Sequence, residues 1–179
     1  MCLSMGSAEG DFSDSSSDTI LEVLGKNPKW STFRTLLTAM PELTSTMENK
    51  DLILDTIYTV FVPTNSAFAK LEKETLFKIG KKDNLPILRK LVRHHFVDDV
   101  MSVDDMTETD KIMTLALLEI NVRPARGGGL LGGGNKEDAA GGIRLNEGII
   151  TRPDIQCCNG VIHEVDSLLN PFLYYRYLV

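Results

Sequence analysis

The sequence predicts a single domain of the α+β class, in which helices of the first half pack beside a mostly antiparallel β-sandwich. Apolar residues recur at helical spacing before residue 100, and short strand-like runs separated by turn residues follow residue 110. Between these regions lies Tyr58–Val62, where every residue is β-branched or aromatic. The length of 179 residues suits one domain with a full core and is short for two.

The N-terminal region predicts a mobile segment followed by two helices. Residues 1–17 are rich in Ser, Asp and Gly, which is typical of a flexible leader. Thr19 and Glu22 form a capping-box pattern that begins a helix, and Gly25 ends it. A second helix begins at Asn27-Pro28, and Pro41 stops it.

The centre of the chain predicts a corner where the sheet meets the helices. The segment 43–57 fits either a helix or an irregular approach to the strand. Tyr58–Val62 is expected to be covered on both faces, and Pro63 ends this strand because it has no N–H to donate. Thr64 and Asn65 offer side-chain oxygens to the first N–H groups of a short helix.

Further helices are expected at Glu74–Ile79 and after Asn84, which is predicted to cap a helix with Pro86 in its first turn. His95 falls on the apolar face of this helix. The segment Asp98–Asp110 has six acidic residues and no basic one. It lacks the Asp-x-Asp-x-Asp-Gly spacing of a calcium loop, so a solvated loop is predicted.

The C-terminal half predicts strands. Ile112–Val122 fits one strand or two, and Ile143–Ile150 fits a hairpin. Asn159-Gly160 is a strong hairpin-turn dipeptide before the closing strand Val161–Val165. The Gly-rich insertion 123–142 has no Gly-Lys-Ser/Thr of a phosphate loop, and loops this long are usually functional or disordered.

Charge and cysteine content argue against several kinds of partner and favour one kind of compartment. The net charge of −6 and the pI of about 5.1 argue against nucleic acid or an anionic membrane as the main partner. The apolar runs are too short for a membrane span. Three cysteines, the lack of an Asn-x-Ser/Thr acceptor and the lack of a secretory signal favour a reducing compartment over secretion.

Three segments resemble the fasciclin-like domain family (fasciclin / beta-Ig-h3 type). Thr59–Phe68 resembles its first signature, and Asp154–Asp166 resembles its closing hairpin. Leu91–Val97 resembles the middle Tyr-His motif, with His94 where Tyr is usual. The resemblance extends from Thr19 to Pro171 and implies a fasciclin-like wedge. The predicted parts are a leader (1–17), the domain (18–171) with its insertion (123–142), and an aromatic tail (172–179).

No catalytic residue, cofactor or metal site is predicted. Adjacent His94 and His95 would point about 100° apart on a helix, and a zinc site needs at least three converging ligands. His95 and His163 are expected to be buried or hydrogen-bonded. Cys157 and Cys158 lack a nearby base, so a structural role is favoured over a nucleophile.

The partner-binding candidates come from two sources. The resemblance implies that the middle motif lies near a partner surface, here formed by His94, Asp98 and Asp99. Exposed apolar and aromatic side chains anchor interfaces, which adds a second set of candidates. These are Leu130, Leu131, Phe172, Tyr174, Tyr175 and Tyr177.

The resemblance implies a non-enzymatic module that binds other proteins. The preferred hypothesis is a structural or accessory subunit, or a linker, in a multi-protein assembly. By analogy with family members, that assembly would be an algal plastid light-harvesting complex. One alternative is a secreted or cell-surface adhesion domain. Another is a domain that binds a small apolar ligand or pigment.

Overall fold

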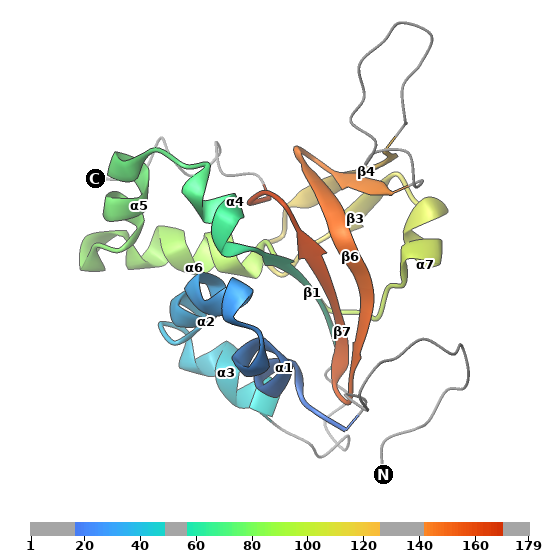
Figure 1. Cartoon of the computed structure of the whole chain (residues 1–179), viewed down its shortest axis with the longest axis horizontal. Coiled ribbons are helices and arrows are strands. Elements are labelled where there is room, and N and C mark those ends of the chain that lie inside the picture. Colours follow the sequence, from blue (N-terminus) through green and yellow to red (C-terminus); the bar gives the residue numbers. More distant parts are fainter. Residues whose placement is uncertain (1–16, 49–56, 126–141, 170–179) are drawn as a thin grey trace, which may run out of the picture.

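The computed structural model describes residues 17–48, 57–125 and 142–169. Helices lie on one side of a seven-stranded sheet with the strand order β2-β1-β7-β6-β5-β4-β3, and the short helix α7 lies on the other side (Figure 1). The predicted leader and tail, and most of the insertion, lie outside the described residues. No helix in the described part of the chain has both the length and the apolar character needed to cross a bilayer.

The first helices form as their end signals predict, with shifted ends. The capping box is present: Thr19 Oγ1 accepts from the Glu22 amide at 3.2 Å, and Glu22 Oε2 accepts from the Thr19 amide at 2.8 Å. The first helix runs past Gly25, and Pro41 begins a helix rather than only stopping one, as suits proline in a first turn. These elements are α1 (Ile20–Lys26), η1 (Pro28–Trp30), α2 (Ser31–Leu37) and α3 (Pro41–Glu48).

The predicted central strand and closing strand are neighbours. β1 (Tyr58–Pro63) is buried at every position and pairs in parallel with β7 (Gly160–Val165), which places Phe61 opposite His163. Every other strand pair is antiparallel. These two segments, distant in sequence, therefore lie side by side in the sheet, and the predicted α+β wedge is confirmed.

The corner after β1 also forms as predicted. Thr64 caps α4 (Asn65–Ala69) by accepting from the Ala67 amide at 3.3 Å. Asn84 occupies the predicted N-cap position, with Pro86 in the first turn, but its side chain does not cap the helix. The 3₁₀ turn brings it back to the preceding helix, where Nδ2 donates to the Lys78 carbonyl at 2.8 Å. The elements here are α5 (Lys73–Ile79), η3 (Lys82–Asn84) and α6 (Leu85–Arg93).

The acidic segment is more ordered than the loop predicted for it. Ser102 and Asp105 form a second capping box, so the local side chains satisfy the first amides of a short helix. The open question at 112–122 resolves into two antiparallel strands. The remaining elements are β2 (Phe96–Val97), α7 (Val103–Thr107), β3 (Lys111–Met113), β4 (Glu119–Pro124), β5 (Ile143–Leu145) and β6 (Gly148–Cys157).

Two hydrophobic clusters lie on opposite faces of β1. Val60, Val62 and Ile162 pack with the helices, whereas Phe61 and Val165 face a cluster formed by the remaining strands and α7. This division follows from the two-residue period of side chains along a strand. We call the first the helix-covered face and the second the loop-covered face.

Candidate functional site

The structure separates the predicted partner-binding residues. Asp98 and Asp99 are exposed on the loop between β2 and α7, and Val100 beside them is 44% exposed. His94 is fully buried, so its side chain is not part of the exposed surface expected for it. The other candidates, Leu130, Leu131, Phe172, Tyr174, Tyr175 and Tyr177, lie outside the described residues.

The loop 98–102 is hydrogen-bonded to the sheet through a buried threonine of β1. Thr59 of β1 donates its hydroxyl proton to the Asp99 carbonyl at 2.7 Å. The same oxygen accepts from the Met101 amide at 2.8 Å. One side chain therefore satisfies two backbone groups of the loop and fixes its path over β1.

A second fastening runs through His163 of β7. Its Nε2 lies 2.8 Å from the Met101 carbonyl, and its Nδ1 accepts from the Asp154 amide at 3.1 Å. Since a carbonyl only accepts and an amide N–H only donates, the imidazole is neutral with its proton on Nε2. Asp154 adds a further bond, because its Oδ1 accepts from the Val103 amide at 3.0 Å.

The environment of His163 favours this neutral form. Burial lowers the pKa of His163, while the bond to the Met101 carbonyl and the charge of Asp154 act in the opposite direction. Its ring also stacks against Phe61, with 5.7 Å between ring centroids. The loop is thus positioned by an uncharged ring packed into the loop-covered face.

The other two histidines are buried beside the helices, and the prediction of a buried, hydrogen-bonded His95 is confirmed. His95 donates from Nδ1 to the Leu91 carbonyl at 2.9 Å and accepts at Nε2 from the Leu169 amide at 3.1 Å. His94 Nδ1 meets the Thr114 hydroxyl at 3.0 Å. Burial lowers the pKa of His94 to about 4 and that of His95 to about 3.

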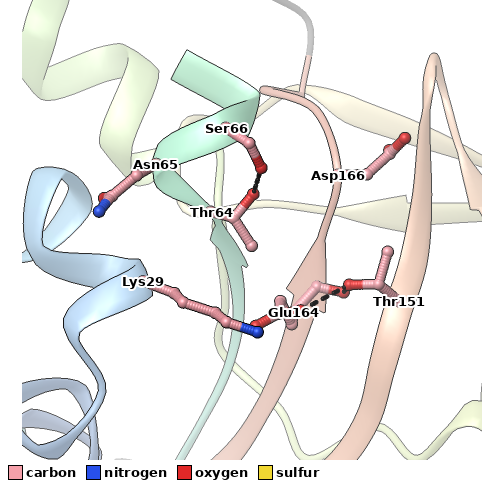
Figure 2. A pocket seen from close by; sticks show the side chains of 7 residues that line it. All are labelled: Lys29, Thr64, Asn65, Ser66, Thr151, Glu164 and Asp166. Carbon is pink, nitrogen blue, oxygen red and sulfur yellow. Dashed lines mark hydrogen bonds between the residues drawn. The ribbon is translucent and has the colours of Figure 1, made fainter. Parts of the chain in front are cut away.

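An open hollow of about 380 Å³ lies at the corner between β1 and α4. Figure 2 shows its polar lining, which comes from η1, from the start of α4 and from β6 and β7. The lining residues are Lys29, Thr64, Asn65, Ser66, Thr151, Glu164 and Asp166. All seven lining residues have polar or charged side chains, so hydrogen-bonding groups surround the hollow.

The acids of this hollow already have partners within the fold. Glu164 accepts from Trp30 Nε1 and from the Thr151 hydroxyl, each at 2.8 Å. Asp166 accepts from the Ile149 amide at 2.8 Å and from Lys70 Nζ at 3.1 Å. These carboxylates therefore act as structural links between η1, the sheet and the α4 corner.

The cysteines and acidic groups do not form a reactive centre in the described residues. Burial raises the pKa of Cys157 to about 12, which keeps its thiol protonated and poorly nucleophilic. Within the described ranges, no group of three or more His, Cys, Asp or Glu side chains could hold a metal ion.

Sequence reasoning missed the two fastenings of the loop. The predicted buried or hydrogen-bonded role of His163 is confirmed, but the motifs that contain Thr59, Asp154 and His163 do not indicate contacts with this loop. The signal that could have indicated their role is the pairing of Asp154 with the closing strand in one hairpin. The bonds to Met101 themselves depend on a loop 62 residues away in sequence.

Together, the helices and the mostly antiparallel sheet define an α+β wedge with a charged, exposed loop. The chain belongs to the Fasciclin domain family, whose model matches residues 28–171. Domains of this family are generally non-enzymatic modules for adhesion and interaction with other proteins.

Similar proteins come from bacteria and animals. Uncharacterized protein sll1735 of Synechocystis is 24% identical over 150 residues, covering 84% of this chain and 96% of that protein. Immunogenic protein MPB70 of Mycobacterium bovis is 25% identical over 156 residues, covering 87% of this chain and 70% of that protein. Mouse Stabilin-1 is 30% identical over 115 residues, covering 64% of this chain but only 4% of Stabilin-1.

A solved structure confirms the fold. The domain pair of the insect cell adhesion molecule Fasciclin I matches with a TM-score of 0.67 at 20% sequence identity. The match covers 90% of this chain and 53% of that structure, so the chain spans about half of the pair. At this identity the match establishes the architecture.

Proposed function

We propose that this chain is a non-enzymatic protein-interaction module that binds a basic partner through the loop 98–102 and the adjoining α7. The observation that carries the proposal is the exposed pair Asp98 and Asp99 beside half-exposed Val100, on a loop fastened by buried hydrogen bonds. A loop held in one conformation loses less entropy when it binds.

The charge of this surface indicates the chemistry of the partner. Asp104, Asp105 and Glu108 follow the loop on and beside α7, and all three are exposed. Such a surface attracts a positively charged partner and speeds their encounter, and the attraction weakens as salt rises. Val100 would supply the apolar contact that acidic side chains lack.

The interaction hypothesis is tested by reversing the loop charges. We expect the double variant D98K/D99K to bind the proteins that copurify with the native chain at least tenfold more weakly, as measured by quantitative mass spectrometry. The matched control E72K/D83K makes the same change in net charge at exposed positions near α5. Equal binding by both double variants would contradict the proposed surface.

The aromatic tail and the insertion provide a second proposed contact. Removing residues 172–179, or replacing Leu130 and Leu131 with Ser, should weaken partner binding without changing the affinity contributed by Asp98 and Asp99. The support is the sequence composition of these segments. Retention of every partner by both variants would refute this contact.

The wider role that we propose is that of a structural or accessory subunit, or a linker, in a larger assembly. Cell adhesion is the second candidate, and the description of Fasciclin I as a cell adhesion molecule favours it. The relatives described above give no support for a plastid light-harvesting role. Gene sequence upstream of this chain would distinguish a plastid transit peptide from a secretory signal, and absorbance of native protein would reveal a bound pigment.

A further inference from the structure

The loop 98–102 and β7 are joined by a short path of hydrogen bonds that passes through a single ionisable ring. His163 is hydrogen-bonded to the Met101 carbonyl on one side and to the Asp154 amide on the other. Asp154 Oδ1 in turn accepts from the amide of Val103, which is the first residue of α7. The C-terminal part of the loop, at Met101, and the start of α7, at Val103, therefore depend on this ring.

We propose that His163 is a positioning residue that holds the loop 98–102 in its binding conformation while neutral and releases it when the ring gains a proton. The inference rests on the proposed function, because it makes this loop the partner surface. It adds that binding by this surface is switched off in acidic surroundings.

The consequence of protonation follows from the hydrogen-bond geometry. A neutral ring with its proton on Nε2 donates to the Met101 carbonyl and accepts from the Asp154 amide. A proton on Nδ1 would place two donors, the ring N–H and the Asp154 N–H, against each other at 3.1 Å. The ring or the Asp154 backbone must then move, and either movement disturbs the bond of Asp154 to Val103.

Backbone geometry favours movement of Asp154, rather than of the His163 ring, when the ring is protonated. Its φ of 53° lies in the left-handed region, which is uncommon outside glycine, asparagine and aspartate. It also lies where the register of β6 with β7 shifts between Arg152 and Ile155. A bulge at this place has fewer ladder bonds that would resist movement.

The charges around His163 set the direction of the response. On β6 the carboxylate of Asp154 favours the protonated ring, and β1 contributes the uncharged ring of Phe61. On the loop, the Met101 carbonyl contacts the ring, and the acids Asp98, Asp99, Asp104 and Asp105 of the loop and α7 are exposed. Burial opposes protonation, so the pKa of His163 is lowered and release takes place below pH 6.5.

Amide hydrogen exchange measured by NMR tests the switch without a partner. The Met101 and Val103 amides are bonded to Thr59 and Asp154, so their exchange reports the state of the loop. From pH 7.0 down to the lowest pH at which the domain stays folded, we expect their protection factors to fall about tenfold further than those of β1 and β7. An equal fall in both groups, or no fall, would overturn the proposal.

Two variants separate positioning from simple support. H163Q can still donate and accept but does not titrate, so its loop protection should not change with pH. D154N keeps an oxygen for the Val103 amide and suits a positive φ, but removes the charge that favours protonation. It should shift the release to lower pH by about half a unit, equivalent to a modest Coulombic contribution. An unshifted midpoint in D154N, or a wild-type pH response in folded H163Q, would refute the role.

The two proposals fail in different ways. If D98K/D99K keeps the pH response but binds partners normally, the surface is wrong and the switch stands. If wild-type protein binds equally well at pH 7.0 and at the lowest pH at which it stays folded, although D98K/D99K does not bind, the surface stands and the switch is wrong.

Discussion

Each face of the β1–β7 pair carries a neutral histidine packed against a phenylalanine, but the two histidines hold different parts of the chain. On the helix-covered face, His95 packs against Phe33 with 5.7 Å between ring centroids, and on the loop-covered face His163 packs against Phe61 at the same distance. Each ring is neutral and each bonds two backbone groups. The same chemistry thus occurs once on each side of the sheet.

The difference lies in what each ring holds. His95 joins Leu91 of α6, in the helix-covered cluster, to Leu169 after β7, which belongs to the loop-covered cluster. His163 joins β7 to an exposed loop. We infer that the first ring contributes to the stability of the whole domain, whereas the second controls the geometry of a surface that the domain presents.

Acid should have the largest effect on both faces. A histidine with a folded pKa below its unfolded value of about 6.5 stabilises the fold fully above that pH, and the contribution is lost as pH falls toward the folded pKa. The pKa values of His94 and His95 are about 4 and 3. Between the unfolded pKa and these values, the stabilisation from each histidine falls by about 1.4 kcal/mol per pH unit. At pH 4.5 the two together cost about 5 kcal/mol, which urea unfolding followed by circular dichroism would measure.

His95 is the histidine whose protonation should destabilise the whole domain. In H95Q the dependence of unfolding free energy on pH should be reduced by about 1.4 kcal/mol per unit between pH 6 and pH 4. H163Q should have a smaller effect on global stability over this range. A larger effect of H163Q than of H95Q would reverse our assignment of the two roles.

Core truncation tests whether the faces fold together. Phe33→Ala and Phe61→Ala should each lower the free energy of unfolding by about 3–5 kcal/mol, because both rings are almost fully buried. Since both faces share β1 and β7, each variant should unfold in one transition with circular dichroism and Trp30 fluorescence in agreement. Separate transitions in Phe61→Ala would show that the loop-covered face unfolds independently.

Asn159 is the main polar link on the helix-covered side. Its Oδ1 accepts from the Ile20 amide at 2.8 Å, and its Nδ2 donates to the Met47 carbonyl at 2.7 Å. Asn159→Ala leaves two buried backbone groups without partners, so we expect a loss of about 2–4 kcal/mol in denaturant titration. Loop protection at Met101 should be unchanged, and a parallel loss there would contradict the separation of the faces.

The smallest effect is expected at the link between η1 and β7. Trp30→Phe retains most of the buried ring but removes the Nε1 donor to Glu164, so the expected loss is about 1–2 kcal/mol. Thermal unfolding of this variant beside Thr151→Val, which removes the other donor to Glu164, would measure it. A neutral result for both would show that solvent replaces these bonds.

Local sequence patterns predicted the elements better than the contacts between them. The strand Tyr58–Val62, its corner at Thr64 and the capping box at Thr19 are all present, because each depends on residues within four positions of one another. Asn84 was predicted to cap a helix but bonds to the preceding one, since the 3₁₀ turn that brings it there has no strong local signal.

The predicted surface residues also show that local sequence patterns do not predict tertiary contacts. Asp98 and Asp99 are exposed, as a charged loop should be, but His94, which was expected on the same surface, is fully buried. Its burial is decided by what packs there, in this case Thr114 from the β3–β4 turn.

By itself, the sequence determined the α+β class, the buried central strand, the closing strand and the acidic character of one segment, because composition and short-range spacing encode these properties. Only the tertiary structure decided that Thr59, Asp154 and His163 meet beneath an exposed loop. Their contacts depend on strand register and on a bulge, which arise when segments 40 to 62 residues apart are brought together by packing.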